Sequence, residues 1–315
     1  MPSEPLVSVI IPVYNGGDYL RQAIDSALAQ SYAPIELLVV NDGSDDGGAT
    51  RRIAQSYGAQ IRYFEKENGG VSTALNLGIR EMRGAYFSWL SHDDLYDPRK
   101  IEAEVRALPG EGARSLIYCN YETIDRDARP MADTKRSGRL SASLSAREAL
   151  HHVLRHGALN GCGFLIPREA FAECGGFAEE LRYAQDSLMW YRLFAAGWSL
   201  TVVPERLVKS RVHENQQTQK NRGKFSGDDR AICAYMLPVF AQLSTDGDDF
   251  VLDYALRSAL KGEDGNLRAC VDRLKADGRY GLPARARISA TRAYGRLRPG
   301  VRKLYYQLFR GIRTG

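Results

Sequence analysis

The sequence predicts an α/β protein in which a mixed, mostly parallel sheet is flanked by helices and followed by a mainly helical C-terminal region. Two observations lead to this fold class. Before residue 222, short β-branched runs alternate with segments that carry apolar residues at helical spacing, whereas from residue 223 on the pattern is mainly helical. We therefore expect a domain over residues 1–222, with halves of about 1–115 and 116–222, and a helical region over 223–315.

The first half should open with two strand–helix units. The run 7–13 is apolar and β-branched, and residues 20–28 carry apolar side chains at helical spacing. A second strand over 36–40 leads through the polar turn 41–45 into a helix from about 47 to 57. Such units are typical of a parallel or mixed sheet covered by helices.

Two more strands and two more helices should complete this half. A strand is expected over 60–64, and Ser72 is expected to cap the helix that follows it. Residues 85–90 have the pattern of a buried strand, and acidic residues follow it. Asp97 and Pro98 then supply an N-cap and a first-turn proline for another helix.

The second half has a less regular pattern. We expect a strand over 115–120, no clear element in the polar stretch 125–143, and a helix that begins at Ser145. Strand and helix patterns then alternate again. They cover a strand at 161–166, helices at 167–174 and 186–196, and a strand at 198–203.

The composition is that of an ordinary globular protein, with 44% apolar and 26% charged residues. No apolar run approaches the roughly 20 residues of a membrane helix. Because the first residues also lack the features of a signal peptide, we expect a cytoplasmic protein. The five cysteines are odd in number and form no CxxC pair, which favours small core residues over a disulfide framework or a zinc site.

Positive charge is concentrated at the C-terminus. Residues 281–315 contain eight arginines, one lysine and no acid, so this segment has a charge of +9. Because the net charge of the whole chain is +5, the remaining residues have a net charge of −4. Within the basic segment, 302–310 mixes cations with apolar residues at helical spacing, which would suit contact with an anionic membrane surface. A helix packed on the rest of the protein and a disordered tail are equally consistent with this pattern, and nucleic-acid binding is disfavoured because no fold for it accompanies the charge.

Polar clusters stand where an open α/β sheet presents its ligands, at the carboxyl ends of strands. Pro12–Asn15 ends the first strand, and its aromatic ring and amide suit a base and ribose. Asn41–Ser44 follows the second strand, and Gln185–Asp186 begins a helix, where an aspartate can act as a general base. Taken singly, each of these three is explained at least as well by ordinary turn or helix-start chemistry.

The fourth cluster, Ser91–Asp94, points to a metal ion. Asp93 and Asp94 are adjacent after a very apolar strand, and neighbouring carboxylates repel each other unless a cation neutralises them. Oxygen ligands favour Mg²⁺ or Mn²⁺. The alternative is a solvated turn before the next helix, but the apolar strand favours the metal.

Together these segments resemble the inverting glycosyltransferases of family 2, which have the GT-A fold, over roughly residues 6–220. The resemblance rests on seven ordered blocks. They are Val7–Asn15, Glu36–Ser44, Glu67–Gly70 with Ala74–Asn76, Trp89–Asp94, Gly175–Phe177, Gln185–Asp186 and Arg211–Gln216.

The resemblance implies roles for individual residues. It implies that Asp93 reaches the metal ion with Asp94 in support, that His213 lies near the diphosphate, and that Asp186 is the catalytic base. It also implies a nucleotide pocket in the first half, with the acceptor bound by the second. The residues that should line the pocket are Pro12, Tyr14, Asn15, Asp42 and Asn68, with Asp93 and His213 at its diphosphate end.

Two residues depart from the usual family pattern. Ser91 stands where the Asp-x-Asp motif has its first acid, which would weaken metal binding. Gln185 replaces the glutamate of a Glu-Asp pair, which would make Asp186 less basic because a neighbouring carboxylate raises a pKa.

The expected activity is transfer of a sugar from a nucleotide-diphosphate sugar, with UDP favoured, to an acceptor hydroxyl by an inverting single displacement. The acceptor is expected to be a glycan or glycolipid in surface polysaccharide or glycolipid assembly. A catalytically inactive nucleotide- or carbohydrate-binding module is the alternative. A dehydrogenase or nucleotidyltransferase is disfavoured because Pro12–Gly17 is not the glycine-rich loop that those enzymes have after their first strand.

Overall fold

A computed structural model describes residues 4–110, 112–131, 140–214, 216, 226–245 and 249–309, with only the backbone described for 226 and 297–309. The chain divides into two compact units, Met1–Val153 with Ala158–Phe225, and Leu154–Gly157 with Ser226–Gly315. The expected boundary at residue 222 and residues 310–315 of the basic tail lie outside the described residues.

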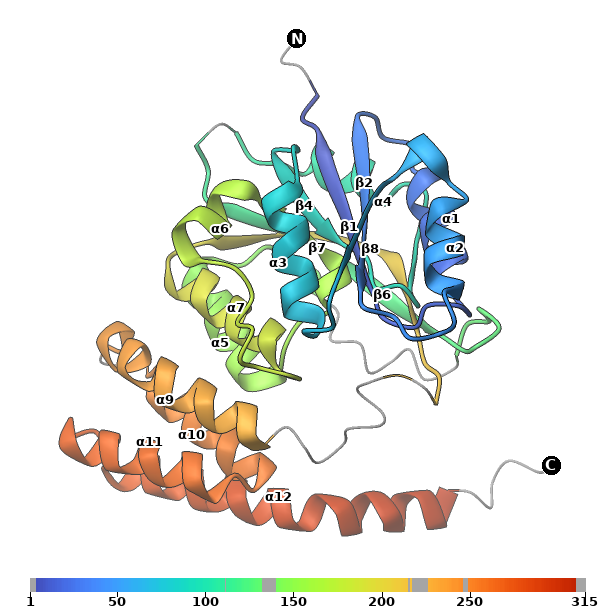
Figure 1. Cartoon of the computed structure of the whole chain (residues 1–315). Helices are drawn as coiled ribbons and strands as arrows, with labels where there is room; N and C mark the ends of the chain where they lie inside the picture. The colour runs from blue at the N-terminus through green and yellow to red at the C-terminus, as the bar shows by residue number, and fades with distance from the viewer. Residues whose placement is uncertain are drawn as a thin grey trace. The chain divides into compact units, whose positions relative to one another are not determined.

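The first unit is built on an eight-stranded sheet (Figure 1). Its spatial order is β3-β2-β1-β4-β7-β6-β8-β5. The strands are β1 (Val7–Val13), β2 (Ile35–Asp42), β3 (Arg62–Lys66), β4 (Tyr86–Trp89), β5 (Leu95–Tyr96), β6 (Ser115–Ile124), β7 (Phe164–Pro167) and β8 (Ser199–Arg211).

The direction of the strands decides where the site forms. β1 pairs in parallel with both β2 and β4, and β2 pairs in parallel with β3. β7 is antiparallel to its neighbours β4 and β6, so β6 and its parallel partner β8 run in the same direction as β4. The carboxyl ends of β1, β2, β4, β6 and β8 therefore meet at one edge of the sheet, as expected for a mixed, mostly parallel α/β fold.

Helices cover both faces of this sheet. Because crossovers between parallel strands are right-handed, helices that lead outward from β1 lie on one face and the helix that leads back to β4 lies on the other. Figure 1 shows this separation, with α1 and α2 on one side and α3 on the other. The helices of the unit are α1 (Leu20–Leu28), α2 (Ala49–Gln55), α3 (Val71–Glu81), α4 (Lys100–Arg106), α5 (Ala146–His156, whose last turn belongs to the second unit), α6 (Arg168–Cys174) and α7 (Gln185–Ala195).

Element boundaries differ from the sequence predictions where a distant group replaces a local signal. Ser72 does not cap α3: the helix begins at Val71 and Ser72 is buried inside its first turn. α4 begins at Lys100, two residues after the predicted start at Pro98, although Asp97 Oδ1 still accepts a hydrogen bond from the amide of Arg99. Ser145 and Glu148 form a reciprocal capping box before α5, as a cap at Ser145 predicts.

Two strands of the second half, β6 and β8, are longer than their patterns indicate, and β7 is shorter. β8 extends to Arg211 rather than ending near residue 203, because it continues as the partner of β6 through an irregular register around Asn120. The segment Gly161–Gly163 is a short 3-10 helix, and the strand β7 begins only at Phe164.

The core between β4, β7, α6 and α7 is aromatic. Its rings pack edge-on, tilted or stacked, and the Phe164 and Trp190 rings stack with centroids 4.0 Å apart. The other members of this cluster are Phe87, Trp89, Phe171 and Phe177. Burying these large side chains stabilises the part of the sheet from which the acidic turn and α7 project.

In the described part of the second unit, the helices are α9 (Ser226–Leu243), α10 (Phe250–Lys261), α11 (Asp264–Ala276) and α12 (Leu282–Phe309), and Leu154–Gly157 also belongs to this unit. Asp249 caps α10 by accepting a hydrogen bond from the amide of Leu252. Gly295 lets α12 approach α10 closely, since a Cβ there would lie 2.7 Å from the carbonyl oxygen of Leu260. No helix within the described residues combines the length and apolar character needed to cross a membrane.

Candidate active site

The loops after β1 and β2 are tied together at the carboxyl edge of the sheet. Asn15 adopts a φ of 55°, and its side-chain amide forms two hydrogen bonds with Asp45. Asn15 Nδ2 donates to Asp45 Oδ1 at 2.6 Å, and Asn15 Oδ1 accepts from the backbone amide of Asp45 at 2.9 Å. The Tyr14 hydroxyl also donates to Asp45, and the ring remains exposed. Pro12 is a buried residue of β1 opposite Val40. A left-handed backbone at an asparagine, fixed by a reciprocal contact, holds Tyr14 as an open aromatic surface.

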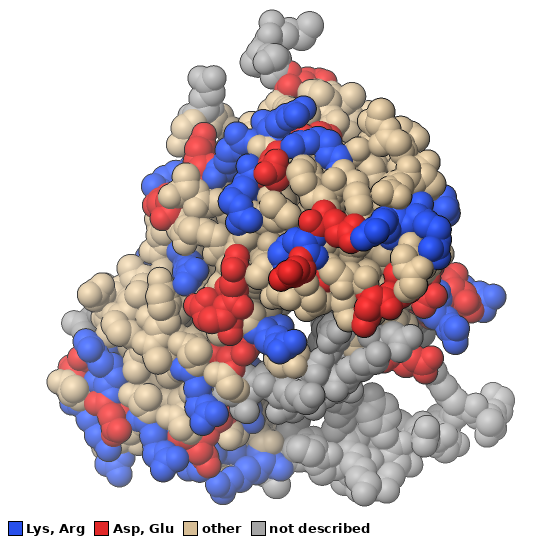
Figure 2. Space-filling view, in the orientation of Figure 1, with Lys and Arg blue, Asp and Glu red and all other residues tan. Residues whose placement is uncertain are grey.

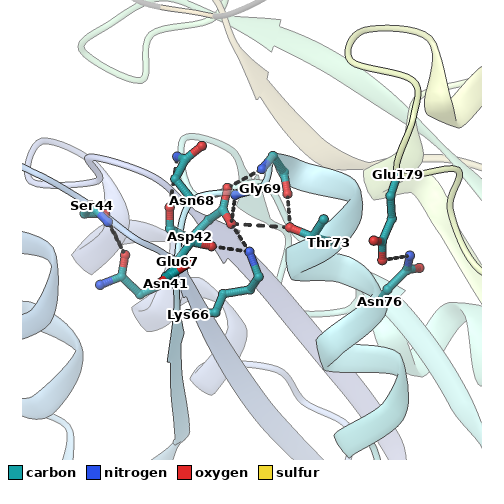
Figure 3. Close-up of polar contacts among 11 residues, drawn as sticks. Asn41, Asp42, Ser44, Lys66, Glu67, Asn68, Gly69, Thr73, Asn76 and Glu179 are labelled. Carbon is teal, nitrogen blue, oxygen red and sulfur yellow. Dashed lines mark hydrogen bonds and ion pairs between the residues drawn. The ribbon is translucent and has the colours of Figure 1, made fainter.

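Asp42 is surrounded by donors of the protein itself (Figure 3). Its carboxylate is 3% exposed, accepts from Lys66 Nζ at 2.6 Å, and accepts from the backbone amides of Gly69 and Gly70 at 3.0 and 2.7 Å. Thr73 Oγ1 lies 3.4 Å away. These amides stand at the start of α3, so Asp42 supplies the helix-terminus contact that the sequence assigns to Ser72.

Asn68 lies on the same turn but presents its side chain differently. Nδ2 donates to the backbone carbonyl of Asp42 at 3.0 Å, while the residue as a whole is exposed. Gly43 permits this close approach, because it adopts a φ of +66° and a Cβ there would lie 2.6 Å from the amide nitrogen of Asn68. The two predicted pocket residues Asp42 and Asn68 are therefore adjacent, with Asn68 on the outside.

Asp93 and His213 meet in the turn after β4. His213 Nε2 is 3.0 Å from Asp93 Oδ2, and both side chains are about one-tenth exposed. Burial raises the pKa of Asp93. The hydrogen bond to His213 and the nearby His92 and His213 charges lower it by a larger amount, so the pKa of Asp93 falls below its usual value. The neighbouring His92 is half-buried, and burial lowers its pKa.

Asp94 points into the protein instead. Its Oδ1 accepts from the backbone amide of Arg211 at 2.8 Å, and its Oδ2 is 3.4 Å from Cys162 Sγ. Burial and the negative charge of Asp93 raise the pKa of Asp94 to about 8. The two adjacent carboxylates therefore have different positions. Asp93 lies beside His213, whereas Asp94 points inward and fixes the turn to β8 and to the segment before β7.

Arg211 connects these parts and is a residue whose role the sequence did not reveal. It is fully buried, and its guanidinium donates to the carbonyls of Asp93 and Arg126 at 2.7 and 2.8 Å and to Gln22 Oε1 at 2.8 Å. The guanidinium also lies 4.5 Å from the centre of the Tyr19 ring. A buried cation surrounded by carbonyl oxygens orients the acidic turn and the chain after β6 at once.

Asp186 lies in the first turn of α7. Its Oδ1 accepts from the amide of Ser187 at 2.6 Å, and the side chain is half-buried. Gln185 beside it is 7% exposed. Asp186 stands on α7, a different element from the turn after β4 that carries Asp93 and from the segment after β8 that carries His213.

The fold and these polar groups define an α/β protein whose candidate site lies at the carboxyl edge of its sheet. The family model "Glycosyl transferase family 2" matches residues 8–175, just over half of the 315 residues. The chain therefore belongs to glycosyl transferase family 2, which confirms the family resemblance of its sequence motifs.

Its curated relatives include an uncharacterized glycosyltransferase of Rickettsia typhi, which is 48% identical over 219 residues, or 68% of this chain and 66% of the relative. The matched part of the chain spans between 31% and 66% of the length of these uncharacterized glycosyltransferases of Rickettsia species. The shared portion thus covers about two thirds of this chain and at most two thirds of theirs.

Solved structures confirm the GT-A-type fold. A structure of S. aureus TarS 1–349 in complex with UDP-GlcNAc superposes with a TM-score of 0.67 at 16% identity, over 93% of this chain and 91% of that chain. The mannosyltransferase PcManGT from Pyrobaculum calidifontis, in complex with GDP-Man and Mn²⁺, superposes with a TM-score of 0.60 at 20% identity, over 95% and 82%. At these identities the likeness concerns the fold.

Proposed function

We propose that this chain transfers a sugar from a nucleotide-diphosphate sugar, with UDP as the favoured nucleotide, to an acceptor hydroxyl. The observation on which this mainly rests is the Asp93–His213 pair, which lies at the same edge of the sheet as the loops after β1 and β2. Membership of family 2 and the nucleotide sugars bound by TarS and PcManGT support the donor class.

The donor nucleotide would bind against the first two loops. Tyr14 offers an exposed ring for stacking, and Asn15 and Asn68 offer amides at the surface, while Pro12 and Asp42 shape the pocket from below. We assign Asp42 to holding the turn before α3 rather than to the base, because protein donors already occupy its carboxylate.

A divalent cation fits the Asp93–His213 pair. Among the described residues, no group of three or more His, Cys, Asp or Glu side chains is arranged to hold a metal ion, so the protein would supply two ligands and the diphosphate others. Carboxylate oxygen is a preferred ligand of Mg²⁺ and Mn²⁺, and Nε2 of His213 lies 3.0 Å from Oδ2 of Asp93, so both groups could reach one ion. Asp93 and His213 would thus hold Mg²⁺ or Mn²⁺, and Asp94 would support their turn.

The chemistry proposed for these groups is a single displacement with inversion. When bound, the cation would neutralise charge that develops on the departing diphosphate. Asp186 takes the proton of the acceptor hydroxyl, whose oxygen bonds to the anomeric carbon from the face opposite the nucleotide. The bond from that carbon to the diphosphate breaks, and the configuration inverts. Gln185 adds no charge beside Asp186.

The acceptor is proposed to be a glycan or glycolipid in surface polysaccharide assembly. The protein itself is proposed to be cytoplasmic and to attach to the inner face of a membrane. The +9 charge of residues 281–315 supports this, since anionic lipids contribute about 1 kcal/mol per nearby Lys or Arg. On the visible face of the described residues, by contrast, basic and acidic side chains are interspersed (Figure 2). Sedimentation with anionic but not neutral vesicles is the expected result.

Metal-dependent release of nucleotide from a donor sugar tests the proposal. The purified protein should release one nucleotide from its sugar in the presence of Mn²⁺ and acceptor lipid, and a chelator or Asp186→Asn should abolish the release. A nucleotide that raises the unfolding temperature without any release from its sugar would instead favour the alternative, an inactive binding module.

A further inference from the structure

Two sequence segments have no role in the site described so far, although both belong to the blocks on which the family resemblance rests. They are Ala74–Asn76 within α3 and Gly175–Phe177 after α6. The structure brings them into direct contact across 101 residues of sequence.

The side chain of Asn76 pairs with the backbone of Phe177. Its Oδ1 accepts from the Phe177 amide at 2.8 Å, and its Nδ2 donates to the Phe177 carbonyl at 2.8 Å. Nδ2 also donates to Glu179 Oε1 at 2.8 Å, a contact visible in Figure 3. An asparagine that satisfies both polar groups of one residue fixes the position of that residue more tightly than a single bond would.

The fit leaves no room for another residue at position 176. A Cβ on Gly176 would lie 2.4 Å from Asn76 Oδ1, and Gly175 before it adopts a φ of +78°. The two glycines therefore let the chain pass directly over the amide of Asn76.

The segment held by Asn76 contacts α7 in two places. The carbonyl of Gly176 accepts from Arg192 of α7 at 3.4 Å. The ring of Phe177 is 2% exposed and packs edge-on against Trp190 of α7, with centroids 6.5 Å apart, and against Trp89 of β4, with centroids 5.8 Å apart. Trp89 ends the strand that precedes the acidic turn, so Phe177 touches the elements that bear both Asp93 and Asp186.

The other side of α3 belongs to the donor half. Its first turn is held by the carboxylate of Asp42, and Gly78 packs against Ile10 of β1, where a Cβ would lie 2.5 Å from the isoleucine side chain. α3 is thus fixed to β1 and β2 on one side and to the 176–179 segment on the other (Figure 3).

We propose that Asn76 is a positioning residue that sets the 176–179 segment, and through it α7, so that Asp186 faces the sugar held by the donor half. The inference rests on the proposed function, because it takes Asp186 as the base. A proton acceptor displaced by about 1 Å can lose on the order of 100-fold in rate, whereas the nucleotide loops do not depend on this contact.

The test compares Asn76→Asp and Asn76→Ala with the native protein in the full chain. Asn76→Asp keeps the size but turns a carboxylate oxygen toward the Phe177 carbonyl and Glu179, and Asn76→Ala removes all three bonds without adding charge. We expect kcat to fall at least tenfold in both, with the donor KM within about twofold and an unchanged nucleotide-dependent rise in unfolding temperature.

Arg80→Ala is the matched control, because Arg80 is exposed on the same helix. It should leave kcat and KM as in the native protein. Variants of Asn76 with a kcat within twofold of this control would overturn the inference, as would a loss of nucleotide binding that parallels the loss of kcat. A native protein without transferase activity would count against the proposed function itself, and with it against a role for Asn76 in aligning a base.

Discussion

The Nε2 atom of His213 lies 3.0 Å from Oδ2 of Asp93, although 120 residues separate the two in the chain. This pairing is a result of sheet topology. β8 runs in the direction of β4, so its last residue, Arg211, reaches the edge where the acidic turn begins, and the Arg211 guanidinium holds the Asp93 carbonyl there. His213 follows two residues later and closes onto the carboxylate.

If this pair binds a metal ion, Asp93→Asn and His213→Ala should each weaken metal-dependent nucleotide binding. A nucleotide at 100 times its Kd stabilises the native protein by about 2.7 kcal/mol, and a tenfold rise in Kd reduces this to about 1.4 kcal/mol. The check is the unfolding temperature with UDP or GDP, with and without Mn²⁺. Asp272→Asn, which changes an exposed carboxylate in the second unit, is the control. An undiminished Mn²⁺ effect in both variants would exclude the pair as ligands.

Asp94 should behave differently from Asp93. Asp94→Ala leaves the amide of Arg211 and the thiol of Cys162 without their acceptor, and a buried donor left unpaired costs about 1–3 kcal/mol. Asp94→Asn retains an oxygen for Arg211 and should cost less. Urea unfolding of the metal-free variants measures both free energies. If Asp94→Asn instead leaves stability unchanged and removes Mn²⁺-dependent nucleotide binding, Asp94 is a ligand after all.

Local patterns predicted the elements well because they depend on neighbours in sequence. The strand–helix alternation of the first 90 residues follows from β-branched runs and helical spacing. Once the strands were assigned, the polar clusters after them could be assigned to the carboxyl ends of the strands. The start of α3 was wrong for the opposite reason. Ser72 is a good local cap, but the carboxylate of Asp42, a whole strand–helix unit earlier, already accepts from the Gly69 and Gly70 amides.

Arg211 illustrates a second limit. It is one of 43 lysines and arginines, and its position in a motif does not reveal that it is fully buried among carbonyl oxygens. Buried cations are rare enough that composition argues against expecting one. Only the long β8 strand, which the sequence indicated as ending near residue 203, brings Arg211 to the site.

A buried ion pair of α4 gives a third prediction. Lys100 and Glu104 are both fully buried, with Nζ 2.7 Å from Oε2, and Lys100 also donates to Ser88 of β4. Lys100→Met leaves the carboxylate without its cation and should cost about 3–5 kcal/mol, whereas Lys100→Met with Glu104→Leu should cost less than either change alone. Urea unfolding of the three variants measures the coupling, and additive losses would contradict it.

The same pair predicts a dependence on pH. Burial raises the pKa of Glu104 while Lys100 lowers it, and the net direction is upward. A raised folded-state pKa means that stability is greatest below the unfolded pKa and is lost as the pH rises through the folded value. Without Lys100 the pKa rises further, so the loss in Lys100→Met should shrink as the pH falls toward 4. A loss that grows on acidification would show that Glu104 is not the source.

The last prediction separates two roles for Asp42. Its carboxylate accepts from Lys66 and from two amides at the start of α3, and its 3% exposure leaves little surface for a ligand. Asp42→Asn replaces one acceptor oxygen with a donor among these donors, so it should lower the free energy of unfolding by about 1–3 kcal/mol.

Lys66→Met tests the same carboxylate from its partner and should produce a loss of similar direction, because it leaves a buried charge with only amide donors. In both variants, the nucleotide that binds best to the native protein should still bind best, since Tyr14 and Asn15 are held by Asp45 and not by Asp42. The measurement is urea unfolding without ligand, followed by the rise in unfolding temperature with UDP, GDP, TDP and CMP. A protein of native stability whose preference among these nucleotides changes in Asp42→Asn would show that Asp42 contacts the base.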